Sequence, residues 1–131
     1  MASIFSKIIS GELPSYKIYE DDHYFAFLDI RPVVKGHTLV IPKWEVDYIF
    51  DLESDEYIGL MLAARKVAKA LKKVVPCNRI GVAVVGLEVP HTHVHLMPIN
   101  AVSDMNFKNP VVQLSADEFK ALAEDISAAI E

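Results

Sequence analysis

The chain has almost no cysteine, no excess of positive charge and no long apolar run, and each lack excludes a class of protein. One cysteine, Cys77, among 131 residues permits neither an internal disulfide nor a metal centre made of several cysteines. The 13 Lys and Arg residues against 18 Asp and Glu give a formal net charge of −5, whereas proteins that bind nucleic-acid polymers usually present a basic face. No stretch reaches the roughly 20 apolar residues of a membrane helix, and the N-terminal apolar residues are interrupted too early for a signal peptide. We therefore expect a cytoplasmic protein that contacts neither membrane nor nucleic acid.

The apolar content is high enough for a packed core. Hydrophobic residues make up 52% of the chain, and the length is typical of one domain, so residues 1–131 are expected to form a single domain. Alternating and aromatic-rich runs predict strands over residues 16–19, 24–28, 37–41, 79–85 and 91–98. The first three strands follow one another too closely for helical crossovers, which indicates an antiparallel meander.

Three helices are predicted around these strands. Ser3 is placed to cap a short first helix that Gly11 ends, and residues 115–118 (Ser-Ala-Asp-Glu) have the form of a capping box that opens the last helix. Between them, residues 54–74 carry an apolar stripe at three- and four-residue steps, formed by Tyr57, Leu60, Met61, Ala64, Val67, Ala68 and Leu71. The predicted fold class is α+β, an antiparallel sheet with helices packed against it.

Three of the five histidines fall within residues 91–97, which read His-Thr-His-Val-His-Leu-Met. In a continuous strand alternate side chains share a face, so His91, His93 and His95 would project together. An amphipathic strand with a solvated histidine face is one interpretation, although Thr, Lys or Glu usually fill such positions. A zinc site is another, with Asp29 or His37 supplying a further ligand. The third is nucleophilic catalysis, in which one neutral imidazole attacks phosphorus while its protonated neighbours stabilise the oxygens. Spacing alone leaves the last two open.

The segment 91–97 resembles the signature of the histidine-triad (HIT) family, in which hydrophobic residues alternate with three histidines; Thr92 departs at the first hydrophobic position. The segments 4–9 and 26–43, the second ending in Gly-His-Thr-Leu-Val-Ile-Pro-Lys, also match in order and spacing. The likeness covers about the first hundred residues, and the C-terminal extension 101–131 lies outside the signature. The resemblance implies a five-stranded antiparallel sheet with a long helix, usually in a homodimer, that needs no cofactor or catalytic metal.

Members of this family bind nucleoside phosphates and form a covalent nucleotidyl-histidine. The resemblance makes His93 the nucleophile, with the main-chain carbonyl of His91 orienting its ring, His95 donating to the phosphate and His37 completing the polar wall. It makes Asp29 the acceptor for both ribose hydroxyls. The base pocket would be lined by Ile4, Phe5, Ile8, Phe27, Ile30 and Leu39. Without the family, the apolar residues would simply cover the sheet, His37 would be a core histidine and Asp29 a turn residue.

Two departures from the family pattern bear on function. Many bacterial relatives hold a structural zinc through a Cys-x-x-Cys pair and a later histidine, but this chain has Ser3, Ser6 and Glu45 at those positions, so no structural zinc is expected. Nucleotide-hydrolysing relatives carry a polar, glycine-rich loop before the triad, whereas residues 86–90 here are Gly-Leu-Glu-Val-Pro. Glu88 would repel an anion or bind a cationic leaving group.

The resulting hypothesis is a phosphoramidase or related nucleotide hydrolase that acts at the α-phosphate of a purine nucleoside phosphate conjugate. Three alternatives remain at this point. One is cleavage of dinucleoside polyphosphates, and another is a nucleotide-binding module with little turnover, which the altered loop would suit. The last is a metal hydrolase that uses the same histidines.

Overall fold

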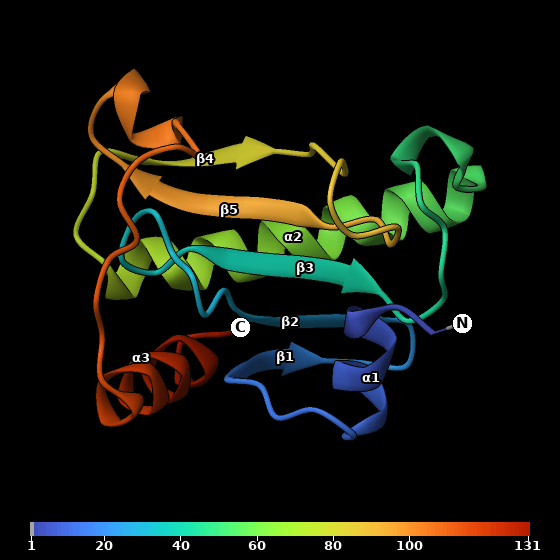
Figure 1. Ribbon diagram of the computed structural model, residues 1–131, viewed down its shortest axis with the longest axis horizontal. Coiled ribbons are helices and arrows are strands. Elements are labelled where there is room, and N and C mark those ends of the chain that lie inside the picture. The colour runs from blue at the N-terminus through green and yellow to red at the C-terminus, as the bar shows by residue number, and fades with distance from the viewer. Residues whose placement is uncertain (1) are drawn as a thin grey trace.

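The computed structural model, which describes residues 2–131, has a five-stranded antiparallel sheet with helices on both faces (Figure 1). This confirms the α+β class and the strand number. In chain order the elements are α1 (Ile4–Ser10), β1 (Lys17–Glu20), β2 (Tyr24–Leu28), β3 (Thr38–Pro42), the 3-10 helix η1 (Ile49–Asp51), α2 (Ser54–Val74), β4 (Arg79–Ala83), β5 (Val94–Ile99), the 3-10 helix η2 (Val102–Met105) and α3 (Ala116–Ala128).

The strands lie in the order β1-β2-β3-β5-β4. The predicted antiparallel meander of β1, β2 and β3 is confirmed, and the chain then crosses over through α2 to the outer strand β4 before returning in β5 beside β3. In the pairing of β3 with β5, Leu39 lies opposite His95 and Val40 lies opposite Val94. This register brings the segment containing His37 next to the end of the histidine run.

The two faces of the sheet bury different sets of side chains. One face packs against α2 and α3 around Val40, Val94 and Leu96. The opposite face, in front in Figure 1, is covered by α1, and its buried residues are Phe5, Phe25, Phe27, Leu39 and Ile41. Because β2 and β3 are covered on both sides, every one of their residues is buried, which explains their nearly continuous hydrophobic sequences.

Helix boundaries agree with the local signals in the sequence. Ser3 caps α1 by accepting a hydrogen bond from the Ser6 amide, and Gly11 ends the helix with a positive φ of 88°. The central helix α2 has the predicted limits, and Ser115 forms the predicted capping box with Glu118 at the start of α3. Such a cap contributes about 1 kcal/mol to helix stability. Within residues 2–131, no helix combines the length and the apolar character needed to cross a bilayer.

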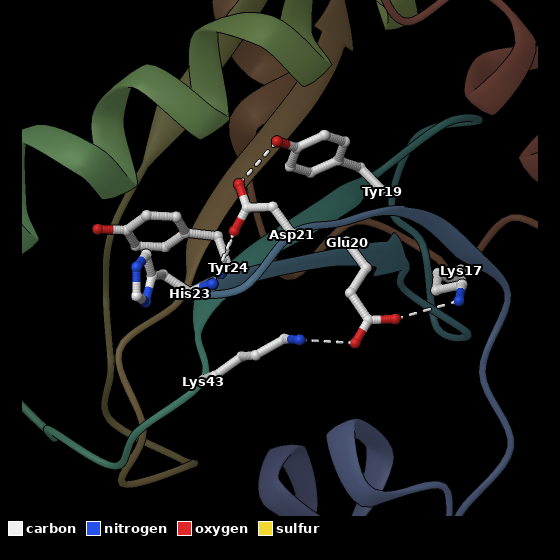
Figure 2. A network of polar contacts seen from close by, with 7 residues as sticks. All are labelled: Lys17, Tyr19, Glu20, Asp21, His23, Tyr24 and Lys43. Atoms are coloured by element: carbon white, nitrogen blue, oxygen red, sulfur yellow. Dashed lines mark hydrogen bonds and ion pairs between the residues drawn. The ribbon is translucent and has the colours of Figure 1, made fainter.

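Polar contacts fasten the β1–β2 turn to the end of β3 (Figure 2). The Asp21 carboxylate accepts hydrogen bonds from the Tyr19 hydroxyl at 2.7 Å and from the Tyr24 amide at 2.7 Å. Glu20 bridges two lysines, with its Oε2 atom 2.7 Å from Nζ of Lys43. Since Lys43 follows Pro42 directly, this pairing fixes the chain at the point where β3 ends beside α1 and the histidines.

Strand limits differ from the prediction mainly near the histidines. The last strand starts at Val94 instead of His91. The amide and the hydroxyl of Thr92 both donate to the main-chain oxygen of Val46, so this residue does not pair with a neighbouring strand of the sheet. The expectation that His91, His93 and His95 alternate along one strand is therefore wrong for the first two, which precede it. Strand β4 stops at Ala83, β1 is shifted by one residue to Lys17–Glu20, and β3 begins at Thr38 and includes Pro42.

Candidate active site

Main-chain contacts fix which nitrogen of the central histidine carries a proton. The Nδ1 atom of His93 lies 2.7 Å from the main-chain oxygen of His91. A carbonyl oxygen only accepts, so Nδ1 of His93 is protonated and donates. In a neutral ring the lone pair is then on Nε2, an atom that makes no hydrogen bond within residues 2–131 and keeps accessible surface. The contact expected between His93 and the His91 carbonyl is present.

His91 is clamped at both ring nitrogens and is fully buried. Its Nε2 atom donates to the main-chain oxygen of Pro42 at 2.8 Å, so its Nδ1 atom is an acceptor, and the Ser3 hydroxyl donates to it at 2.8 Å. The ring therefore joins the end of β3 to the start of α1. This arrangement leaves His91 to act on a ligand through its main chain, by orienting His93.

The hydrogen bonds of His37 and His95 also determine which ring nitrogen of each carries the proton. The Val33 amide donates to Nδ1 of His37 at 3.4 Å, so the proton of the neutral His37 ring is on Nε2, which lies 2.9 Å from Nδ1 of His95. His37 thus donates to His95, and the remaining proton of His95 is on its Nε2 atom. The rings of His93 and His95 are 4.9 Å apart between centroids. Two adjacent rings therefore present a lone pair, on Nε2 of His93, and an N–H donor, on Nε2 of His95.

Burial keeps these imidazoles neutral. Burial, together with the smaller contributions of the neighbouring His37 and His93 rings, lowers the pKa of His95 to about 3. Burial also lowers the pKa of His37, against an opposing contribution from the Asp29 carboxylate, and that of His91, against the Pro42 carbonyl and Glu45. Burial of His37, His91 and His95 is a property of the packed protein that the sequence analysis did not predict.

Two phenylalanines enclose the histidines from opposite ends of the sequence. The Phe5 ring of α1 meets the His93 ring edge-on at 5.0 Å between centroids. Phe107, in the loop after η2, lies 4.8 Å from His95 and 6.0 Å from His37, again measured between ring centroids. Because Phe107 lies against both histidine rings, the C-terminal extension contributes a neighbour of the histidines that the sequence did not identify.

The other expected binding residues fall into three groups, which are buried apolar residues, exposed apolar residues and the carboxylate of Asp29. Phe5, Phe27 and Leu39 are buried together beneath α1, with Ile8 at the edge of the cluster. Ile4 and Ile30 instead expose 51% and 66% of their surface. Asp29 follows β2, and its Oδ2 atom lies 3.8 Å from Nε2 of His37 while Oδ1 accepts from the Arg31 amide at 2.9 Å. The carboxylate is thus held next to the histidines and remains partly exposed.

The loop that precedes the triad exposes several of its side chains to solvent. Gly86 has a positive φ of 75°, and Leu87 is 89% exposed. Glu88 is exposed, whereas Val89 packs against the buried cluster under α1. The His91 amide is occupied by the Val89 main-chain oxygen at 2.8 Å, and the Thr92 amide by that of Val46 at 2.7 Å. These two amides are consequently unavailable to a phosphate.

Two groups of side chains are candidates for binding a metal ion, and neither has the arrangement or the atoms that zinc requires. Asp29, His37 and His95 offer ligand atoms within 4.8 Å of one another. Two histidine ligands of a tetrahedral zinc would stand about 3.3 Å apart, whereas the nitrogens of His37 and His95 are 2.9 Å apart and share a proton. At the positions where zinc-containing relatives would hold a structural zinc, the Ser6 hydroxyl donates to Glu45 at 2.7 Å. Hydroxyl groups are poor zinc ligands beside thiolates, so Ser3, Ser6 and Glu45 do not fit that metal.

Comparison with known proteins defines the class. The family model of the HIT domain matches residues 10–102. An uncharacterised HIT-like protein of Borreliella burgdorferi is 38% identical over 132 residues, covering 95% of each chain. The adenosine 5'-monophosphoramidase of Schizosaccharomyces pombe is 34% identical over 136 residues, covering all of both chains. The crystal structure of a Hit-like protein of Bartonella henselae superposes with a TM-score of 0.83 at 33% identity, over 98% of this chain and 96% of the other. The chain belongs to the histidine-triad family.

Proposed function

We propose that this chain is a nucleotide phosphoramidase that forms a covalent nucleotidyl intermediate on Nε2 of His93. The observation that carries the proposal is the assigned tautomer: the His91 carbonyl holds the His93 proton on Nδ1 and leaves the lone pair on Nε2, beside the N–H of His95. The relative from Schizosaccharomyces pombe, named an adenosine 5'-monophosphoramidase, supports the same reaction class.

The reaction has two displacements at the α-phosphorus. In the first, Nε2 of His93 forms a P–N bond as the P–N bond to the leaving amine breaks, and the amine departs with a proton supplied through His95. Because one P–N bond replaces another, this step is nearly balanced in energy. In the second, water attacks the same phosphorus, loses a proton to the histidines and releases His93 together with the nucleoside monophosphate.

The proton for the leaving group comes from the His37–His95 pair. His95 is neutral in the free protein, since its pKa is about 3. A phosphate bound against its Nε2 atom favours the protonated ring, because a nearby opposite charge raises the pKa of an imidazole. The added positive charge is carried by the hydrogen-bonded His37–His95 pair as a whole, and the Asp29 carboxylate, 3.8 Å from Nε2 of His37, stabilises it.

The nucleoside lies on the α1 side of the histidines in this proposal. The Asp29 carboxylate accepts the two ribose hydroxyls, for which it has free lone pairs. The exposed side chains of Ile4 and Ile30 contact the purine, and the buried Phe5, Phe27, Leu39 and Ile8 form the floor beneath it. The preferred substrate is accordingly a ribonucleoside conjugate.

The functional unit is proposed to be a homodimer joined along β4. This strand is at the edge of the sheet, and Val82 is 53% exposed. An open strand edge with apolar side chains is a common pairing surface. Sedimentation equilibrium should give twice the chain mass, and a Val82→Lys variant should shift the equilibrium toward monomer; a wild-type protein that stays monomeric at high concentration would refute this part.

The decisive test compares His93→Ala with His23→Ala, an exposed histidine in the β1–β2 turn, on adenosine 5'-phosphoramidate. Removing the nucleophile should lower kcat by about four orders of magnitude or more, while the His23 variant should match the wild type. A guanosine phosphoramidate and a diadenosine polyphosphate run in parallel define base and leaving-group preference. Phosphoramidate hydrolysis that survives in His93→Ala rules the function out, and wild-type binding of AMP without turnover of any substrate would identify a binding module instead.

A further inference from the structure

Four polar residues from three separate segments meet at the start of α1. The Glu45 carboxylate, just after β3, accepts through Oε1 from the Ser3 amide and from the Ser6 hydroxyl. Ser3 in turn donates its hydroxyl to Nδ1 of His91, 88 residues further along the chain, at 2.8 Å. Glu45 is thereby linked through one serine to the ring of a triad histidine.

The direction of each hydrogen bond in this group is determined. The Pro42 carbonyl can only accept, which places the His91 proton on Nε2 and makes Nδ1 an acceptor for the Ser3 hydroxyl. The oxygen of that hydroxyl also accepts from the Ser6 amide at 3.0 Å, as the N-cap of α1. Ser3 therefore serves the helix and the histidine at once. Its hydroxyl also lies 3.4 Å from Oγ of Ser6, and the shorter contact of 2.8 Å with Nδ1 of His91 is the one that takes the proton.

Glu45 keeps this serine pair in place. The hydrogen bonds from the Ser3 amide and the Ser6 hydroxyl hold the pKa of Glu45 below its usual value, so the carboxylate remains charged and a strong acceptor at neutral pH. The charge also faces His91, whose pKa it raises against the opposing effect of burial. The carboxylate is at the surface, whereas Ser3 and His91 are buried.

We propose that Ser3 and Glu45 are positioning residues of the reaction: together with Ser6 they lock the His91 ring, and the locked His91 holds its main-chain oxygen where it orients His93. Resting on the phosphoramidase function proposed above, this inference assigns a catalytic task to a surface carboxylate that touches no substrate. The ring of His91 is held at two points, by Ser3 and by the Pro42 oxygen, and its carbonyl holds Nδ1 of His93 at 2.7 Å. Release of one ring nitrogen allows the residue, and with it the nucleophile, to shift.

The critical variant is Ser3→Ala, which removes the hydroxyl and keeps the amide that binds Glu45. A displacement of about 1 Å at a nucleophile costs about 100-fold in rate, so kcat on adenosine 5'-phosphoramidate should fall about 10- to 100-fold with little change in KM. Ser3→Thr, which retains a hydroxyl, should recover most of the rate. Glu45→Ala should lower kcat in the same way, and Glu45→Gln, which keeps an acceptor oxygen, should lower it less.

Matched controls separate positioning from loss of stability. Ser115→Ala removes the equivalent N-cap hydrogen bond from α3, far from the histidines, and Glu124→Gln removes an exposed carboxylate of the same helix. Both should keep the wild-type kcat, although Ser115→Ala should lose about 1 kcal/mol of unfolding free energy, as Ser3→Ala does through its own cap.

Nitrogen-15 NMR of the histidine rings gives a readout that does not depend on turnover. The wild type should show His91 as a single Nε2–H tautomer, and Ser3→Ala should show exchange between tautomers or a shifted Nδ1 resonance. If Ser3→Ala retains both the wild-type kcat and the wild-type His91 resonances, the positioning role is refuted while the function of His93 stands. Should His93→Ala remain active instead, the phosphoramidase proposal fails, and the resonances of His91 alone decide whether Ser3 locks the ring.

Discussion

Nε2 of His37 donates to Nδ1 of His95 across 2.9 Å, and this single contact decides what His95 can offer a ligand. With its Nδ1 atom engaged, the neutral His95 ring presents an N–H group on Nε2. Reversal of that hydrogen bond would present a lone pair next to the His93 lone pair, and two adjacent lone pairs repel a phosphate. The pairing of β3 with β5 sets this contact, because Leu39 and His95 are opposite one another.

A His95→Ala variant should lose rate according to the leaving group. An amine must be protonated as it departs, and general acid catalysis typically contributes about 10²- to 10⁴-fold, so alkyl phosphoramidates should suffer a loss of that size. A leaving group that is stable as an anion, such as a nitrophenolate ester of AMP, should lose much less. Equal losses on both substrates, measured as kcat/KM ratios, would show that His95 does not protonate the leaving group.

Stability should fall as the pH drops from 6.5 to 5. In the unfolded chain a histidine binds a proton near pH 6.5, whereas burial keeps the pKa of folded His95 at about 3 and also lowers those of His37 and His91. The unfolded state therefore binds more protons throughout this interval, and folding loses about 1.5 kcal/mol for each histidine that remains neutral. The contribution is fully present above pH 6.5 and declines on acidification toward pH 3.

Urea unfolding at half-unit pH steps measures this loss of unfolding free energy. The interval lies above the ordinary pKa values of Glu and Asp, 4.5 and 3.8, so histidines dominate the change. A His95→Asn variant should show a shallower decline, smaller by about the contribution of one proton. An unfolding free energy that is constant between pH 6.5 and 5 would show that these rings are already protonated in the folded protein.

Removal of the Phe107 ring should bring water to the histidine pair. In Phe107→Ala the His95 ring loses a neighbour at 4.8 Å between centroids, so its pKa should rise from about 3 by about one unit or more. NMR titration of the His95 ring measures the shift. Phe50→Ala, at a 70% exposed phenylalanine in η1, is the control and should leave the His95 titration unchanged. An unchanged pKa in the Phe107 variant would mean that this ring does not shield the site.

Thr92→Val tests why the triad segment leaves the sheet pattern. The Thr92 hydroxyl donates to the Val46 main-chain oxygen and, at 3.3 Å, to that of Asp47. Valine keeps the shape and the amide contact but loses the hydroxyl, so the unfolding free energy should fall by about 1 kcal/mol. The measurement is a urea midpoint at constant m-value. A variant as stable as the wild type would show that the hydroxyl contact contributes nothing.

Local signals in the sequence were sufficient for most of the fold. Ser3 and Gly11 mark the ends of α1, the apolar stripe marks α2, and the short connections between β1, β2 and β3 permit only an antiparallel meander. The histidine motif was equally visible, because three histidines at alternate positions rarely have a purely structural explanation. Membership of the family followed from three linked segments.

Long-range contacts account for what the sequence did not predict. The start of β5 depends on Thr92 meeting Val46, which is 46 positions away, and no periodicity in residues 91–98 reports such a contact. The cover of His95 by Phe107 depends on how the chain after η2 folds back across the sheet. Desolvation of the imidazoles is likewise a property of the packed protein, whereas the ordinary imidazole pKa of about 6.5 applies to the unfolded chain.

The most direct test of the central claim is to trap the intermediate on His93. Enzyme mixed with radiolabelled adenosine 5'-phosphoramidate, quenched in base within one turnover and digested, should yield one labelled peptide that contains residues 91–95, with AMP on Nε2 of His93. The account predicts this adduct in the wild type and its loss in His93→Ala. Release of AMP from an active enzyme with no labelled peptide at any quench time, or with the label on another residue, would contradict it.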